Sequence, residues 1–180
     1  MDRIGAREFL GREAELATFE LAVADARAGV PSVLLVDGDA GIGKSSLVAE
    51  AARRANVPLI LGRSAHIGGD VIPLAPLMDL LRQVQRTIPE ARANHSESMS
   101  LDQWLSRGSG GAGQGAPAVS EVFVPVLDLV GRLASDDAVI IGIEDLHWAD
   151  TSTWDLFELL ARNLFDEHVV LIGTFRANET

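Results

Sequence analysis

Lys44 is the only lysine in this chain of 180 residues, although the chain contains 15 basic residues. It lies in the segment from Gly38 to Ser45, GDAGIGKS, which matches the pattern G-x-x-x-x-G-K-[ST]. Glycines let backbone N–H groups turn inward to form a cradle for the α- and β-phosphates of a nucleotide. A compact ammonium suits the β- and γ-phosphates, whereas the planar fork of an arginine would fill the same space differently. The pattern therefore predicts a phosphate-binding loop.

The segments on either side of this loop have the order that the loop requires. The aliphatic run from Val33 to Val36 is typical of a buried parallel strand, and residues 46–55 predict a helix with Leu47 and Val48 on one side. In this arrangement the hydroxyl of Ser45 would bind Mg²⁺. The residues predicted to contact the nucleotide through this loop are Gly38, Asp39, Ala40, Gly41, Ile42, Gly43, Lys44, Ser45 and Ser46.

Two adjacent acids, Glu144 and Asp145, follow a second run of buried-strand type, Val139 to Ile143. The carboxyl ends of parallel strands face the ligand crevice, and a phosphate loop needs a carboxylate there to hold Mg²⁺ and to polarise the attacking water. We predict that Glu144 is nearest the metal and that Asp145 is the general base, while the sequence also permits the reverse. Both acids, with Ser45, are candidate Mg²⁺ ligands, and a solvated acidic turn is the alternative interpretation.

Three segments together resemble the ATPase module of signal-transduction NTPases with numerous domains (STAND). They are Leu10 to Leu16 (LGREAEL), Glu144 to Asp150 (EDLHWAD) and Leu171 to Glu179 (LIGTFRANE). The likeness spans nearly the whole chain and is greatest to large ATP-binding regulators of the LuxR type and to ATPase modules that follow some bacterial adenylate cyclase domains. It implies ATP or ADP with Mg²⁺ as ligands and an AAA-type ATPase module.

The resemblance also implies roles for three further residues. Gly11 and Arg12 would lie beside the nucleotide base and ribose, and Arg176 would be the sensor arginine that contacts the γ-phosphate, which makes it catalytic together with Lys44, Glu144 and Asp145. The alternatives are ordinary structural roles: a turn at Gly11, a solvated first helical turn at Arg12 and a surface position at Arg176. His147 is expected to form local hydrogen bonds, and Trp148 to pack or to contact a neighbouring module.

The periodicity of apolar residues predicts an α/β fold. Strands are expected at 32–36, 57–61, 138–143 and 168–174, and helices at 13–28, 46–55, 74–84, 119–133 and 154–164, the last capped by Thr151, Ser152 and Thr153. This alternation predicts a three-layer α/β/α P-loop NTPase fold with a mainly parallel sheet, forming one domain over residues 1–180. The Gly/Ser-rich segment 106–117 is predicted to be a flexible loop.

The resembled fold has five core strands in the order 5-1-4-3-2, followed by a helical lid. The fifth strand and the lid would come after residue 180, so we expect the chain to be an N-terminal or central fragment of a longer protein. The strand that precedes the phosphate loop would otherwise present an unpaired edge, which another copy of the chain could pair with.

The composition limits the partners. The 15 basic and 26 acidic residues give a net charge of −11, which argues against direct contact with nucleic acid or an anionic membrane. The chain contains no cysteine, so disulfides, cysteine-bound zinc and thiol catalysis are excluded. The start of the sequence lacks the pattern of a secretory signal, and its apolar runs are far shorter than the ~20 residues that cross a bilayer. We expect a cytoplasmic protein whose partners are ATP, regulatory or output domains of the same protein, and another copy.

The phosphate loop and the acid pair, together with what the resemblance implies, predict a regulatory ATP switch with slow hydrolysis in a bacterial signalling or transcription regulator. Hydrolysis would be slow because arginines from the lid or from a neighbouring subunit are missing. The alternatives are an ATP-consuming enzyme, such as a remodelling ATPase or a kinase, and a nucleotide-binding scaffold that does not hydrolyse. ATP is favoured over GTP because the guanine-reading motif Asn/Thr-Lys-x-Asp needs a second lysine.

Overall fold

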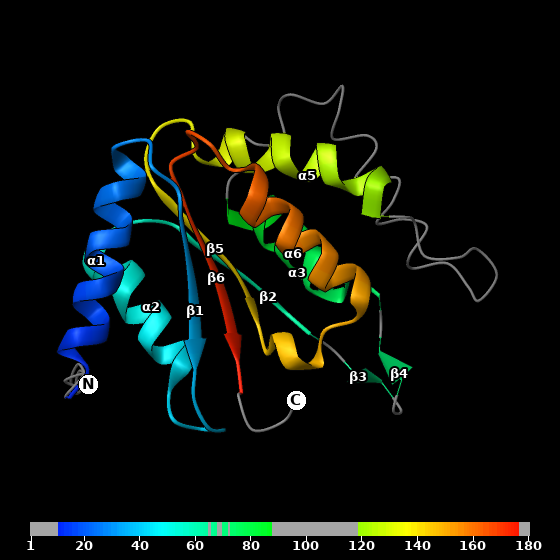
Figure 1. Ribbon diagram of the computed structural model, residues 1–180, viewed down its shortest axis with the longest axis horizontal. Helices are drawn as coiled ribbons and strands as arrows, with labels where there is room; N and C mark the ends of the chain where they lie inside the picture. Colours follow the sequence, from blue (N-terminus) through cyan, green and yellow to red (C-terminus); the bar gives the residue numbers. More distant parts are fainter. Residues whose placement is uncertain (1–10, 65, 68–69, 72, 88–118, 177–180) are drawn as a thin grey trace, which may run out of the picture.

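The computed structural model describes residues 11–64, 66–67, 70–71, 73–87 and 119–176. A parallel four-stranded sheet lies between two layers of helices (Figure 1). Its strands are β1 (Ser32–Asp37), β2 (Leu59–Arg63), β5 (Val139–Glu144) and β6 (Val169–Phe175). They lie in the order β1-β6-β5-β2, and each neighbouring pair is parallel. The predicted three-layer α/β/α fold is confirmed.

Helices cover both faces of the sheet. The helices are α1 (Glu13–Arg27) and α2 (Lys44–Ala55) on one face, and α3 (Ala75–Thr87), α5 (Val119–Leu133) and α6 (Thr151–Asn163) on the other. No described helix is long and apolar enough to span a membrane. Two short elements were not predicted: a hairpin of β3 (His66–Ile67) and β4 (Asp70–Val71), and the 3₁₀ turn η2 (Leu146–Trp148).

The two central strands explain why the sheet has a core on each side. Every residue of β5 and nearly every residue of β6 is buried, as expected for Val/Ile-rich parallel strands that are covered on both faces. Alternate residues of one strand enter opposite cores: Ile140 packs with α1 and α2, whereas Ile141 packs with α3, α5 and α6. Gly173 of β6 lets η2 and α6 approach closely, because a Cβ there would collide with Leu146 and lie 3.2 Å from Phe157 Cζ.

The two edges of the sheet differ. At β2 the side chain of Gln83 on α3 accepts a hydrogen bond from the Leu61 N–H (3.3 Å) and donates one to the Leu61 carbonyl, so it satisfies both backbone groups of Leu61 at this edge. Among the described residues, no strand pairs with the outer edge of β1. The side chains of Val33 and Leu35 on that strand are 43% and 59% exposed.

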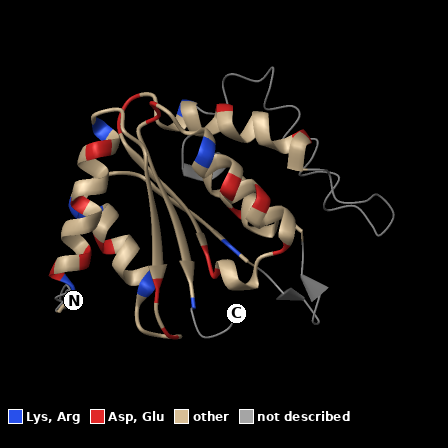
Figure 2. Ribbon diagram, in the orientation of Figure 1, with Lys and Arg blue, Asp and Glu red and all other residues tan. Residues whose placement is uncertain are grey.

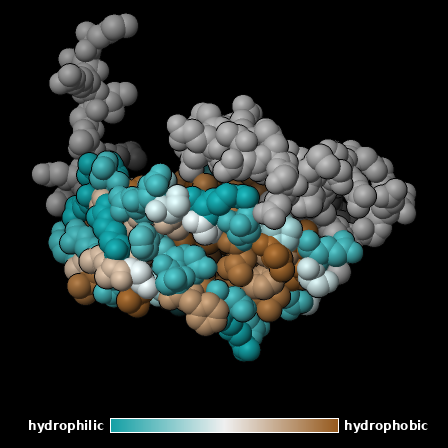
Figure 3. Space-filling view, turned by 90° about the horizontal axis from the view of Figure 1, so that it is seen from above, coloured by the Kyte–Doolittle hydropathy of each residue, from teal (hydrophilic) through white to brown (hydrophobic). Residues whose placement is uncertain are grey.

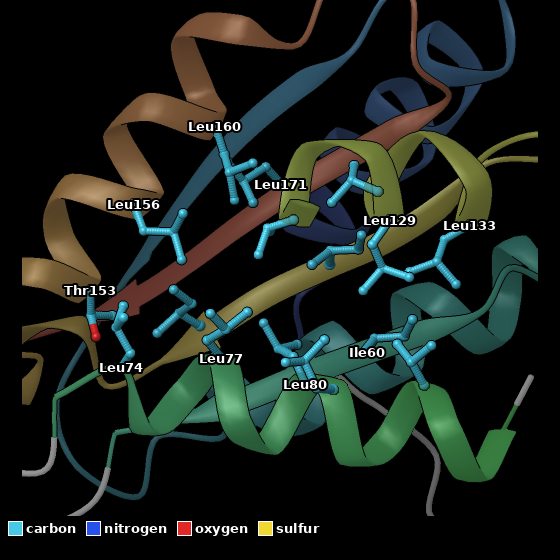
Figure 4. Close-up of a pocket in the computed structure, with 16 residues that line it drawn as sticks. Ile60, Leu74, Leu77, Leu80, Leu129, Leu133, Thr153, Leu156, Leu160 and Leu171 are labelled. Atoms are coloured by element: carbon cyan, nitrogen blue, oxygen red, sulfur yellow. The ribbon is translucent and has the colours of Figure 1, made fainter. Parts of the chain in front are cut away.

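A small cavity of about 40 Å³ lies between the sheet and α3, α5 and α6 (Figure 4). Apolar side chains line it, apart from Thr153, whose hydroxyl donates to Asp150. A cavity of this size and polarity stays dry, and it faces away from the phosphate loop, so it is a packing gap in the core.

Figure 3, which looks onto the amino ends of the strands, shows mostly hydrophilic residues with apolar side chains between them.

Some predicted boundaries were wrong. Helix α6 begins at Thr151 and its cap is Asp150, whose Oδ1 accepts a hydrogen bond from the Thr153 N–H (3.1 Å), so the residues predicted as the cap form the first turn. Helix α2 begins at Lys44 rather than residue 46, because the phosphate loop leads directly into its first turn. The predicted loop 106–117 lies outside the described residues.

An ion pair ties both helices of one layer to the sheet. Arg27 near the end of α1 donates to both carboxylate oxygens of Asp137 (2.8 and 3.0 Å) and to the carbonyl of Ala55 at the end of α2 (3.2 Å). Hydrogen bonds from Arg27 and then from the Ala138 N–H lower the pKa of Asp137 from 3.8 to about 2.

We predict that Asp137→Asn lowers the free energy of unfolding at pH 7 by at most about 1 kcal/mol, because the pair is half exposed and screened by solvent. The pKa of Asp137 is lower in the folded state, so its contribution is complete above pH 4 and is lost as the pH falls towards 2. Urea unfolding at several pH values should show the two proteins converging between pH 4 and 2. A difference that stays constant down to pH 2 would contradict this assignment.

Candidate functional site

The phosphate loop runs from the end of β1 to the start of α2. Gly41 (φ +75°) and Gly43 (φ +93°) have left-handed backbone conformations that favour glycine. Since α2 begins at Lys44, the unpaired N–H groups of its first turn point back into the loop. The Gly38 N–H bonds to the Asp37 carboxylate (2.6 Å), which fixes the start of the loop. The backbone N–H donors of the loop and the N-terminus of α2 therefore face the same site.

Lys44 is buried in this loop, with 8% of its surface exposed. Its ammonium donates to the carbonyls of Gly38 (2.5 Å) and Asp39 (3.1 Å). Within the described residues it forms no ion pair with a carboxylate. A charged ammonium held only by neutral carbonyls is well placed to accept an anion as a stronger partner.

Arg12 lies against the same loop. It precedes α1, and its Nη2 donates to the carbonyl of Ile42 (2.7 Å). Gly11 makes the bend before it, with φ at +88°. Arg12 also lines an open hollow of about 210 Å³ between α1, β1 and α2, whose polar and apolar walls include Glu15 and Phe19. Arg12, which the family resemblance implies beside the nucleotide, therefore adjoins the loop.

The two acids lie at the carboxyl end of β5, the end of the sheet that also carries the phosphate loop (Figure 2). Glu144 is 3% exposed and points to the face that carries α2, because Ile140, four residues earlier on the strand, packs there. Asp145 is half-buried and has a left-handed backbone (φ +56°), with its N–H donating to Thr174 Oγ1 (3.0 Å). The strand and its turn thus give the acids different surroundings.

The surroundings of Glu144 fit the predicted Mg²⁺. One of its oxygens accepts from Arg63 Nε (2.6 Å), whereas Oε1 is buried and has no hydrogen-bond partner among the described residues. A free carboxylate oxygen and the exposed hydroxyl of Ser45 are ligands that Mg²⁺ prefers. The described residues contain no group of three or more acidic or histidine side chains that could hold a metal alone. The ion would therefore depend on phosphate oxygens for most of its coordination.

Arg176 comes directly after β6, which lies between the strand of the phosphate loop and the strand of the acids. It is half-buried at the same end of the sheet. The rings of His147 and Trp148 contact each other, with centroids 5.3 Å apart, and Trp148 is exposed. The arrangement of the strands accordingly gathers the loop, the acids and Arg176 at one end.

The sequence alone did not identify Arg63, Thr174 or Asp150. Arg63 ends β2 and pairs in register with Glu144, a relation that only the strand register reveals. Asp150 Oδ2 accepts from the N–H of Leu74, and its other oxygen caps α6, so it joins two helix N-termini. Aspartate before Thr-Ser-Thr is a recognisable cap pattern, but its bond to Leu74 is not readable from the sequence.

A parallel sheet with a glycine-rich loop between its first strand and a helix, and with acids ending a nearby strand, defines the P-loop class of nucleotide-binding α/β proteins. The AAA ATPase domain family matches residues 8–172, and the chain belongs to this family.

The chain is 29% identical over 199 residues to an uncharacterized protein of Rhizobium meliloti (strain 1021), in an alignment that covers 93% of the chain and 18% of that protein. The chain thus spans less than a fifth of this relative. The solved structure of C. elegans PCH-2 is similar over 93% of the chain and 38% of its own length, with 13% identity and a TM-score of 0.48.

We predict that Asp150→Ala lowers the free energy of unfolding by about 2 kcal/mol, because it removes a helix cap and leaves the buried N–H of Leu74 without its acceptor. Asp155→Ala, at an exposed position of the same helix, is the matched control and should change stability by less than about 0.5 kcal/mol. Urea unfolding measures both, and equal effects would show that Asp150 does not join the two helices.

Proposed function

We propose that this chain binds ATP or ADP with Mg²⁺ through residues 38–46 and acts as a slowly hydrolysing regulatory switch. The observation that carries the proposal is the buried Lys44 ammonium, held only by loop carbonyls at the N-terminus of α2. A glycine-rich anion cradle and a buried cation fit a polyphosphate better than any neutral ligand. Membership of the AAA ATPase domain family supports ATP as the nucleotide.

In this proposal Lys44 leaves the carbonyls of Gly38 and Asp39 for the β- and γ-phosphates, while backbone N–H groups of the loop hold the α- and β-phosphates. Ser45 and Glu144 hold Mg²⁺, which neutralises charge on the phosphate oxygens. Arg176 contacts the γ-phosphate. Gly11 and Arg12 border the base and ribose, which the hollow of about 210 Å³ beside Arg12 could receive.

We propose that Asp145 orients the attacking water and that Glu144 binds the metal. Glu144 is buried and has one oxygen bound to Arg63, so it cannot easily turn towards a water. Asp145 is more exposed, and its bond to Thr174 fixes its backbone. A base must lie within hydrogen-bond reach of the water that it orients, and an accessible carboxylate on a fixed backbone meets that need.

We further propose that the segment works within a longer cytoplasmic protein of the bacterial signalling or transcription-regulator type. Its relative in Rhizobium meliloti is far longer than the matched part. The open edge of β1, at the opposite side of the sheet from the edge of β2 where Gln83 binds Leu61, suits a further strand from the following chain or from another copy. Arginines supplied from outside such a site raise hydrolysis by about 10³- to 10⁵-fold, so the segment alone would be slow.

Calorimetry with ATP, ADP and GTP in the presence of Mg²⁺ tests the binding. We expect adenine nucleotides to bind to the wild type, with GTP weaker, and Lys44→Ala to lose at least about tenfold in affinity. Lys44→Arg should not restore binding, because the guanidinium does not fit the loop. Arg54→Ala, on the exposed side of α2, is the control and should bind as the wild type does. A folded wild type that binds no nucleotide would refute the proposal.

Asp145→Asn should abolish phosphate release while leaving nucleotide affinity within about threefold, because the residue acts on the water rather than on the nucleotide. Phosphate release and calorimetry on the same samples measure both. Hydrolysis by the wild type at ~1 to 1000 per second would favour a dedicated ATP-consuming enzyme over a switch. Equal release by both proteins would exclude Asp145 as the base.

A further inference from the structure

Arg63 reaches from solvent to a buried acid of the site. It is the last residue of β2, directly beside Glu144, the last residue of β5, in the parallel register. Its Nε lies 2.6 Å from Glu144 Oε2. The side chain of Arg63 is 73% exposed, whereas that of Glu144 is 5% exposed. One partner is therefore buried in the protein, and the other lies largely in solvent.

This pair leaves the acid neutralised but not fully coordinated. A buried carboxylate without a counter-ion is strongly unfavourable, so Arg63 compensates Glu144 when no metal is present. The remaining oxygen, Oε1, has no hydrogen-bond partner among the described residues and stays available to a cation. The net charge of the pair is zero, so it attracts a free divalent cation less than Glu144 alone would.

The released arginine would have other acidic neighbours. Asp145 directly follows Glu144 at the carboxyl end of β5, next to the end of β2. Asp79 lies on α3, which packs along β2. An exposed guanidinium can therefore leave Glu144 and remain near negative charge, so the cost of its displacement is small.

We propose that Arg63 is a displaceable counter-ion. It pairs with Glu144 in the metal-free site and leaves this acid when Mg²⁺ binds together with the nucleotide. This inference rests on the proposed function of the site. It makes Arg63 a positioning residue that weakens the binding of free metal, so that the metal enters the site with the nucleotide.

The first test uses Mn²⁺ alone, without nucleotide, and follows the free ion by electron paramagnetic resonance. Arg63→Gln should bind Mn²⁺ on the order of tenfold more tightly than the wild type, because the competing charge is gone. Arg63→Lys keeps the charge and should stay near the wild type, and Arg63→Ala repeats the test with a second neutral side chain. Arg162→Gln removes an arginine of the same exposure, paired with Glu158 on α6, and should change nothing.

A double-mutant cycle with Glu144→Gln shows whether the gain in Mn²⁺ affinity depends on this acid. We expect Arg63→Gln to lose its advantage when Glu144 is also changed. The inference is overturned if neutral variants at Arg63 bind Mn²⁺ no better than the wild type, or if the gain persists without Glu144. Thermal unfolding of each variant confirms that the comparison is between folded proteins.

The second test compares the affinity for ADP with Mg²⁺ and with EDTA by calorimetry. Arg63→Gln should increase the ratio of the two affinities on the order of tenfold, because Glu144 then repels metal-free phosphates and attracts the metal more strongly. An equal loss in both conditions would instead make Arg63 a direct phosphate ligand. If no variant binds nucleotide, the proposed function fails, while the Mn²⁺ result still decides the role of Arg63.

Discussion

The buried ammonium of Lys44 is the constraint on which the rest of the site depends. A charge with 8% of its residue surface exposed needs partners, and the loop supplies them by turning two carbonyls inward. That turn requires glycines with left-handed backbones at positions 41 and 43, and it requires α2 to begin at once. The loop is therefore shaped around a cation before any phosphate arrives, which lowers the cost of ordering it on binding.

The sheet places the other charges around this loop. Parallel strands in the order β1-β6-β5-β2 bring the ends of β5 and β6 to the same edge, with Thr174 of β6 fixing the backbone of Asp145. Glu144 faces α2 because side chains alternate between the two faces of the sheet along β5, and Ile140, four residues earlier, packs on that face. Close packing at Gly173 holds η2 against the sheet and so sets where the turn after the acids leads. The strand order and the side-chain alternation that build the sheet therefore also position the charged groups of the site.

Local patterns accounted for most of the fold. The strands and helices were predicted within a few residues, because long apolar runs and helical periodicity depend only on neighbours in sequence. The phosphate loop and the acid pair were likewise visible as short motifs. Arg63 was not, because its role depends on which residue of β5 lies beside the end of β2. The hydrogen bond from Leu74 to Asp150 and the hairpin of β3 and β4 were also not predicted, since long-range contacts and two-residue strands leave no periodic signal in the sequence.

Hydrogen–deuterium exchange with and without ADP and Mg²⁺ tests most directly whether the loop is the phosphate cradle. We predict that the nucleotide slows exchange of the backbone amides of residues 39–46, since those N–H groups would bond to phosphate oxygens. Slower exchange at the carboxyl ends of β5 and β6 should accompany it, while α5 should not change. Protection confined to another surface, with the amides of residues 39–46 unaffected, would show that this loop is not the phosphate cradle.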